Sequence, residues 1–138
     1  MTPEALAALH KAAFTDLRPW SAAEFKDLLS QSGMILCGDA KSFVLGRQIG
    51  DEAEVLTLAT HPGHLRKGYA ARHLATFIGQ LKASGVTRVF LEVAENNQPA
   101  KALYINNNFY VVGHRKQYYA GANGDKIGAD VMERRLEA

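Results

Sequence analysis

The sequence predicts a single mixed α/β domain of the α+β kind, in which helices flank a central, mostly antiparallel sheet. Helical periodicity near the N-terminus, apolar runs separated by Gly-Asp pairs, and a later helix followed by a β-branched strand lead to this prediction. With 47% hydrophobic and 22% charged residues, the composition is that of an ordinary globular protein with a substantial core. No internal repeat or linker divides the chain, so we expect one domain over residues 1–138.

Two helices are predicted before the first strand. Thr2 and Pro3 are the residue types of a helix N-cap and first turn, and apolar residues follow them at helical spacing. Residues 14–20 interrupt this pattern. Ser21 and Glu24 then have the spacing of a capping box, which predicts a second, short helix that ends at Gly33.

The next segment predicts an antiparallel meander. Three apolar runs, at Met34–Cys37, Ser42–Ile49 and Ala53–Thr60, are separated by the pairs Gly38-Asp39 and Gly50-Asp51. Glycine and aspartate are typical of the tight turns that join neighbouring antiparallel strands. We therefore expect these runs to be consecutive strands of one sheet.

The second half of the chain predicts further helices and strands. Apolar residues recur with helical period after Gly68, and Ser84-Gly85 ends that helix before a β-branched strand at 86–93. A short helix around Tyr104 comes next, and strands at 109–113 and 131–136 flank a polar loop at 121–128.

Charge and cysteine usage exclude several classes of function. The 16 Lys and Arg residues and 14 Asp and Glu residues are interspersed, and the net charge of +2 predicts no nucleic-acid surface. There is no apolar run of membrane-spanning length and no charged-then-apolar leader, so no membrane partner is expected. The single cysteine, Cys37, lies in an apolar run and is expected to be a small buried residue of a protein in the reducing cytoplasm.

A basic turn precedes the helix that starts after Gly68. Arg66 and Lys67 stand directly before this glycine, and the N-terminus of a helix presents unpaired N–H groups that bind anions. The turn is neither a P-loop nor a dinucleotide fingerprint, because the additional glycines of those motifs are missing. By itself the triplet is equally consistent with a solvated basic turn.

The surroundings of this turn resemble the GNAT superfamily of acyl-CoA-dependent N-acetyltransferases. In that family a strand ends in a proline-containing turn, and Gln/Arg-x-x-Gly-x-Gly/Ala begins a helix whose amides bind the CoA pyrophosphate. Here the strand is Val55–Thr60, the turn is His61-Pro62-Gly63, and the signature is Leu65–Ala70, with Leu65 in place of the usual Gln or Arg. The resemblance implies the GNAT fold with its first strand missing, and acetyl-CoA as cosubstrate. It implies that the cofactor is bound by Leu58, Ala59, Thr60, Arg66, Lys67, Gly68, Tyr69, Ala70, Ala71 and Asn97.

The stretch LEVAENNQPAKALYINNNFYVVGHRKQYY is similar to the bacterial RimI-type enzymes, which acetylate the N-terminal alanine of a ribosomal protein. This resemblance implies direct acetyl transfer to a protein N-terminus, with Glu92 as general base and Tyr104 as general acid. Strand alternation independently places Glu92 on the face opposite Leu91 and Val93. The residues alone leave two alternatives open, a solvent-facing carboxylate at Glu92 and a core tyrosine at Tyr104.

On the acceptor side, the resemblance implies that the aromatic residues Phe14, Trp20, Tyr118 and Tyr119 line the groove for the amine. Phe14 and Trp20 are equally consistent with hydrophobic staples between helix and sheet. No metal is expected, because only His61 and His64 lie close together and no Cys or carboxylate joins them at ligand spacing. The alternatives for function are a GNAT that acetylates a small-molecule amine or a lysine, and a non-catalytic acyl-CoA-binding module.

Overall fold

The computed structural model describes residues 1–14, 18–120 and 126–136, apart from the side chains of residues 117–120. The N-terminal half contains α1 (Pro3–Ala13), α2 (Ala22–Leu29), β1 (Met34–Gly38), β2 (Ser42–Ile49) and β3 (Glu52–Thr60). The second half contains the short 3₁₀ turn η1 (Pro62–His64), α3 (Tyr69–Ala83), β4 (Arg88–Ala94), α4 (Gln98–Asn106), β5 (Tyr110–Ala120) and β6 (Lys126–Arg135). Thr2 caps α1, and Ser21 and Glu24 form the predicted capping box of α2.

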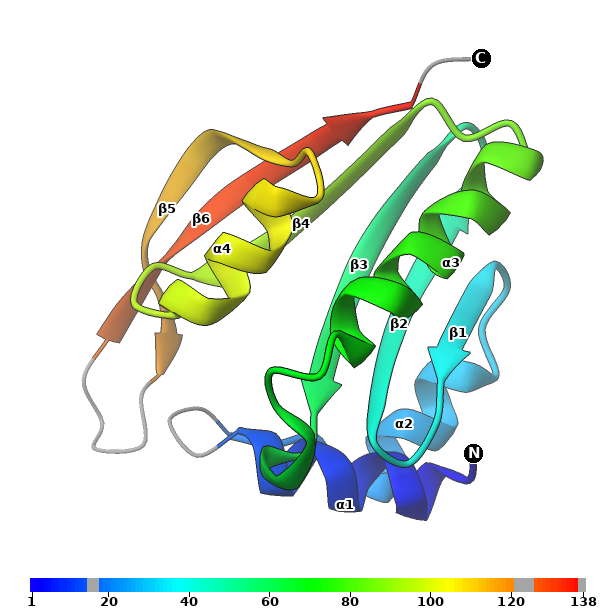
Figure 1. Ribbon diagram of the computed structural model, residues 1–138, viewed down its shortest axis with the longest axis vertical. Coiled ribbons are helices and arrows are strands. Elements are labelled where there is room, and N and C mark those ends of the chain that lie inside the picture. Colours follow the sequence, from blue (N-terminus) through cyan, green and yellow to red (C-terminus); the bar gives the residue numbers. More distant parts are fainter. Residues whose placement is uncertain (15–17, 121–125, 137–138) are drawn as a thin grey trace.

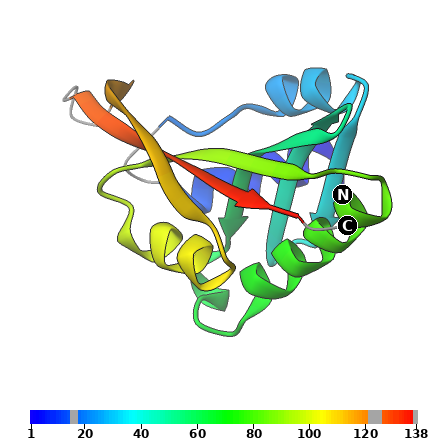
Figure 2. The same ribbon diagram turned by 90° about the horizontal axis from the view of Figure 1, so that it is seen from above.

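The strands form one six-stranded sheet in the order β1-β2-β3-β4-β6-β5. All neighbouring pairs are antiparallel except β3 and β4, which α3 connects as a crossover. Helices α3 and α4 cover one face of the sheet, and α1 and α2 lie on the other (Figures 1 and 2). The predicted fold class is confirmed.

The last two strands are longer than the sequence predicts. β5 continues to Ala120, where the prediction ended at Gly113, and β6 begins at Lys126, where a polar loop was expected. β5 is an edge strand that pairs only with β6 among the described strands, and its residues 114–116 are exposed and polar. Hydrophobic alternation therefore cannot reveal this part, since cross-strand ion pairs take the place of apolar contacts.

The core has one apolar cluster on each face of the sheet. The predicted stripe of α3 is buried against the strands, with Leu74 and Phe77 fully inaccessible to solvent. Cys37 belongs to the same cluster, and burial raises the pKa of its thiol, as expected for a structural cysteine. Gly46 is required at its position on β2, because a Cβ atom there would overlap the Phe77 ring and the Glu54 carbonyl oxygen.

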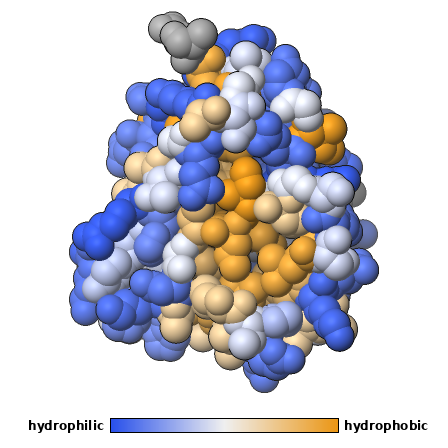
Figure 3. Space-filling view, turned by 90° about the vertical axis from the view of Figure 1, so that its right-hand side faces the viewer, coloured by the Kyte–Doolittle hydropathy of each residue, from blue (hydrophilic) through white to orange (hydrophobic). Residues whose placement is uncertain are grey.

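Strand β1 forms an outer edge of the sheet. In the part of the chain that the structure covers, it pairs only with β2. Figure 3 faces this side of the molecule and shows apolar side chains gathered on it, and Met34, Ile35 and Leu36 of β1 are only partly buried. None of the helices described is long and apolar enough to cross a membrane.

A buried histidine, His10, packs against Phe25 of the second cluster, and its titration is expected to influence stability. Burial, with a smaller contribution from Arg18, lowers the pKa of His10 from 6.5 to about 4, and Glu24 opposes the shift. Because the unfolded chain binds a proton more readily than the folded one, the stabilisation is complete above about pH 6.5 and is lost towards pH 4. As the pH is lowered from about 6.5 to 4, the free energy of unfolding should fall more steeply for the wild type than for His10→Leu. The difference in slope should be about 1.4 kcal/mol per pH unit. Urea unfolding of both proteins across this range would measure the difference, and equal slopes would refute it.

Candidate active site

The site lies where the parallel strands β3 and β4 diverge. They pair only from Glu52–Arg88 to Val55–Leu91, after which β3 continues beside β2 and β4 continues beside β6. Beyond Val55, the edge of β3 that faces β4 therefore has no strand paired with it among the described residues. Backbone groups on such an edge are available to an extended ligand, which would complete the hydrogen bonding of the strand. Leu58, Ala59 and Thr60, predicted to bind the cofactor, are on this edge.

A β-bulge at Leu56 marks the start of the divergence. Leu45 pairs with Thr57 and Gly46 pairs with Val55, so Leu56 has no partner on β2. The extra residue reverses the side-chain alternation of β3. Val55 packs with α3 on one face, whereas Thr57 contacts α1 on the other.

Glu92 faces the sheet surface opposite α3 and α4. Its neighbours Leu91 and Val93 are buried in the core, as the predicted alternation requires, and the Glu92 side chain remains 21% exposed. Arg115 of β5 reaches across β6 and forms an ion pair with the Glu92 carboxylate, with 2.9 Å between Nη1 and Oε1. The guanidinium group therefore orients the carboxylate at the point where β3 and β4 separate.

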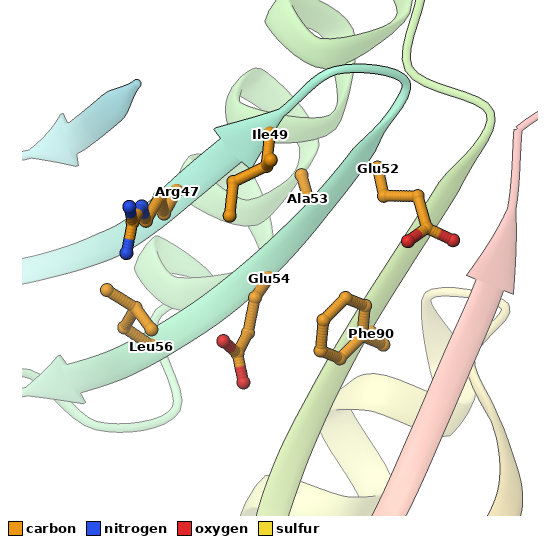
Figure 4. A pocket seen from close by; sticks show the side chains of 7 residues that line it. All are labelled: Arg47, Ile49, Glu52, Ala53, Glu54, Leu56 and Phe90. Carbon is orange, nitrogen blue, oxygen red and sulfur yellow. The ribbon is translucent and has the colours of Figure 1, made fainter. Parts of the chain in front are cut away.

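A second carboxylate, Glu54, lies on the same face. Glu54 pairs with Phe90 across the β3–β4 ladder, and both line a pocket of about 180 Å³ (Figure 4). Burial raises the pKa of Glu54, the nearby Glu92 carboxylate raises it further, and Arg47 opposes both. The pocket and the nearby Glu92 therefore lie on the same face of the sheet, which could receive an amine and the group attached to it.

Tyr104 of α4 lies on the other face of the sheet. It is 6% exposed and belongs to the core cluster under α3 and α4, against which Leu58 of β3 also packs. Its ring contacts Phe109, with 5.7 Å between the ring centroids. Glu92 and Tyr104 therefore belong to opposite faces of the sheet, which suits groups that serve the two sides of one reacting centre.

The helix that carries Tyr104 is anchored to the last hairpin. Lys101 of α4 binds Asp130 of β6, with 2.7 Å between Nζ and Oδ2, and His114 of β5 lies 3.0 Å from the other oxygen of the same carboxylate. Lys101, and then His114, hold the pKa of Asp130 below its usual value. This network joins α4 to β5 beside the residue that binds Glu92.

The basic turn before α3 has the geometry of an anion site. Gly68 is the N-cap in the left-handed conformation at φ 78°, and no side chain caps the helix. The first backbone bond of the helix is donated by the Arg72 N–H to Gly68, so the N–H groups of Tyr69, Ala70 and Ala71 point out of the helix end without intrahelical acceptors. Residues 61–91 contain no Asp or Glu, so no carboxylate of this segment competes for these groups. The donor set fits a phosphate group of a cofactor.

Cations surround this helix terminus, and one of them was not predicted. The ammonium group of Lys41, in the β1–β2 turn, lies 5.4 Å from the centre of the Tyr69 ring. Burial lowers the pKa of His64, and the positive charges of Lys67, His61 and Lys41 lower it further. Lys41 is distant in sequence from the glycine turn. Its position beside the N-terminus of α3 is therefore visible only in the folded structure, where the β1–β2 turn lies against that helix.

Replacing Lys41 tests this electrostatic environment. Lys41→Ala is expected to raise the KM for acetyl-CoA about two- to fivefold, because an exposed charge at a helix terminus contributes about 0.3–1 kcal/mol. Steady-state kinetics at low and high salt would measure the effect, which should shrink as salt increases. Lys82→Ala, at the other end of α3, is the matched control and should leave this KM unchanged; an equal change in both variants would exclude a local role.

The remaining predicted residues have assigned places but no tested roles. The Asn97 side chain caps α4 by accepting a hydrogen bond from the Ala100 N–H at 3.2 Å. Phe14 and Trp20 pack around His10 next to β3, and Tyr118 and Tyr119 belong to β5, although their side chains lie outside the described part of the structure. Among the described residues, no group of three or more His, Cys, Asp or Glu side chains is suited to hold a metal.

Comparisons with known proteins agree on one family. The sequence model of the acetyltransferase (GNAT) family matches residues 6–109. The chain is 34% identical over 91 residues to the [ribosomal protein bS18]-alanine N-acetyltransferase of Haemophilus ducreyi, an alignment that covers 66% of this chain and 63% of that protein. It is 34% identical over 116 residues to N-alpha-acetyltransferase RimI of Mycobacterium tuberculosis, with 78% of this chain and 72% of that protein covered.

Solved structures support the same relationship. The ribosomal-protein-S18-alanine N-acetyltransferase of Escherichia coli superposes with a TM-score of 0.88 and 25% identity, covering 99% of this chain and 88% of that one. The sequence alignments with the bS18-alanine N-acetyltransferases of two Haemophilus species span only 63% and 61% of those proteins. The family match over residues 6–109, together with the diverging strands and the anion-binding turn, shows that this chain belongs to the acetyltransferase (GNAT) family.

Proposed function

We propose that this protein transfers an acetyl group from acetyl-CoA to the N-terminal amine of an acceptor protein, with alanine as the first residue and ribosomal protein bS18 as the leading candidate. The observation that carries the proposal is the opening between β3 and β4, which has Glu92 on one face and Tyr104 on the other. The similarity to bS18-alanine N-acetyltransferases supports the choice of acceptor. We expect the reaction to take place in the cytoplasm, where ribosomal proteins are made.

Glu92 is the residue that would accept the proton of the acceptor amine. The amine must lose a proton as its nitrogen attacks the thioester carbonyl carbon, and a carboxylate held by Arg115 can accept that proton directly or through a water molecule. Within the segment Leu58, Ala59 and Thr60, the N–H groups that point away from β2, which alternate with those directed towards β2, are suited to stabilise the oxygen that becomes negative.

The basic turn before α3 and Tyr104 would serve the cofactor side of the reaction. The N–H groups of Tyr69, Ala70 and Ala71 would hold the pyrophosphate, assisted by Arg66 and Lys67, with Asn97 beside the cofactor at the start of α4. When the carbon–sulfur bond breaks, the CoA sulfur leaves with the bonding electrons, and the Tyr104 phenol can give it a proton. The acetyl group passes directly to the amine, without a covalent enzyme intermediate.

An N-terminal acceptor makes modest demands on this base. The reference pKa is near 7.7–8.0 for an α-amino group and 10.4 for lysine, so deprotonating lysine costs about 3.4 kcal/mol more. One carboxylate that is partly exposed to solvent is sufficient for the easier task. This difference favours an N-terminus over a lysine as the acceptor.

Acceptor profiling tests the proposal. Purified protein is expected to release CoA from acetyl-CoA with peptides that begin with alanine, and to prefer them over Nα-blocked lysine peptides and small amines. Mass spectrometry of the product should locate the acetyl group on the α-nitrogen. Preference for a lysine or a free small amine would show that the proposed N-terminal acceptor is wrong. Binding of acetyl-CoA without transfer to any amine would identify a non-catalytic binding module.

A further inference from the structure

His10 is a buried titratable residue for which the proposed chemistry has no role. It lies on α1 and is 1% exposed, and its ring is enclosed by aromatic side chains from three segments. It stacks on Trp20 with 5.1 Å between centroids, and it makes edge contacts with Phe14 at 4.1 Å and Phe25 at 5.4 Å. The ring thus joins the end of α1, the segment before α2, and α2 itself.

The hydrogen bonds of His10 define a single tautomer. The Trp20 backbone N–H donates to Nδ1 at 2.9 Å, so Nδ1 must be the unprotonated nitrogen. The ring proton is therefore on Nε2, which lies 3.0 Å from Thr57 Oγ1 and can donate to it. Of the charged groups nearby, Glu24 raises and Arg18 lowers the pKa of His10, and burial outweighs both, so the imidazole is neutral near pH 7.

The position of Thr57 connects this histidine to the active site. Thr57 follows the bulged residue Leu56, on the part of β3 that has already diverged from β4. Trp20 and Phe14 occupy the segments that would border the acceptor groove. A chain of two hydrogen bonds therefore runs from the Trp20 backbone through the imidazole to the strand edge beside the reacting centre.

We propose that His10 is a positioning residue for the acceptor: it holds the segment around Trp20 at a fixed place relative to Thr57 of β3, and so sets the width of the acceptor side of the opening. The inference rests on the proposed acetyl transfer. It predicts a selective defect, because the anion turn and α3 do not depend on this link. Breaking it should weaken acceptor binding and leave acetyl-CoA binding intact.

The test is a double-mutant cycle that cuts the link at each end. His10→Phe fills the ring volume without a hydrogen-bond acceptor and is expected to raise the acceptor KM about tenfold, the effect of losing about one hydrogen bond. Thr57→Val should raise it about threefold or more, and Thr57→Ser should restore it. If the two residues act as one link, the double variant should be no worse than His10→Phe alone. The KM for acetyl-CoA should change less than about twofold in every variant.

Several outcomes would overturn the proposal. These are additive effects of the two substitutions, an unchanged acceptor KM, or parallel increases in both KM values, which indicate general destabilisation. If His10→Phe does not fold, the comparison is made between Thr57→Val and His10→Asn. The Asn carboxamide oxygen can still accept the hydrogen bond from the Trp20 N–H. His10→Asn is then expected to affect the acceptor KM no more than Thr57→Val does, and a larger effect would contradict the link.

A spectroscopic readout separates this inference from the proposed function. Nitrogen-15 NMR of the wild-type imidazole should show the proton on Nε2 and no titration of His10 between about pH 5 and 8. A proton on Nδ1, or titration in that range, would refute the link whatever the activity. A wild-type protein with the expected tautomer that acetylates no amine would instead refute the proposed function, and the role in acceptor positioning with it.

Discussion

Glu92→Gln is expected to lower kcat for an N-terminal alanine peptide by about a hundredfold or more, the usual range for loss of a general base. Glutamine keeps the size of the side chain, and its amide oxygen can still accept a hydrogen bond from Arg115. The amide cannot take a proton from the amine, so the chemical step should be affected while the KM for acetyl-CoA is not. Steady-state kinetics with an alanine peptide and acetyl-CoA would measure the loss.

Neighbouring carboxylates provide the controls for this prediction. Glu52→Gln makes the same change in another side chain that lines the pocket but is 48% exposed and pairs with Arg88, and it should retain nearly full kcat. Glu54→Gln addresses the carboxyl group whose pKa is raised in the pocket. If Glu54→Gln abolished turnover and Glu92→Gln did not, the base would be Glu54 and the proposed assignment would be wrong.

Tyr104→Phe is expected to lower kcat with acetyl-CoA about ten- to a hundredfold without unfolding the protein, because the ring and its packing against Phe109 remain. The missing phenol should matter less when the leaving thiol is more acidic. An acetyl thioester of an acidic aryl thiol should therefore restore much of the activity, provided that the site accepts this shorter donor. The ratio of kcat/KM values for variant and wild type with each donor measures this rescue.

Tyr110→Phe is the matched control for the loss of a phenol. Tyr110 is exposed, and its hydroxyl donates to Glu133 at 3.2 Å on β6, so its removal should leave kcat unchanged. If Tyr104→Phe were equally impaired with both thioesters, its hydroxyl would have a role other than protonating the sulfur. Thermal unfolding of both variants, with shifts below about 4 °C expected, would confirm that packing is preserved.

The local signals in the sequence predicted most of the fold. Capping residues predicted both N-terminal helices, and the apolar stripe of α3 is buried as its period requires. Prediction failed in the last hairpin, where residues 114–116 of β5 are polar and exposed and the His114 ring hydrogen-bonds to Asp130 of β6. Polar contacts between strands produce no periodic pattern within one segment of the sequence, because each partner lies on a different strand.

For the candidate site, strand alternation by itself placed Glu92 on the face opposite Leu91 and Val93, and the glycine turn before α3 was recognised as a candidate anion site through its surroundings. Only the tertiary structure revealed that Arg115 orients Glu92, that Glu54 lies near enough to Glu92 for the two charges to interact, that Lys41 lies beside the anion site, and that His10 links α1 to Thr57. These partners are far apart in the sequence. The bulge at Leu56 turns Thr57 towards His10, and the pairing of β4, β6 and β5 brings Arg115 to Glu92. Both depend on pairing between strands and not on the properties of any single segment.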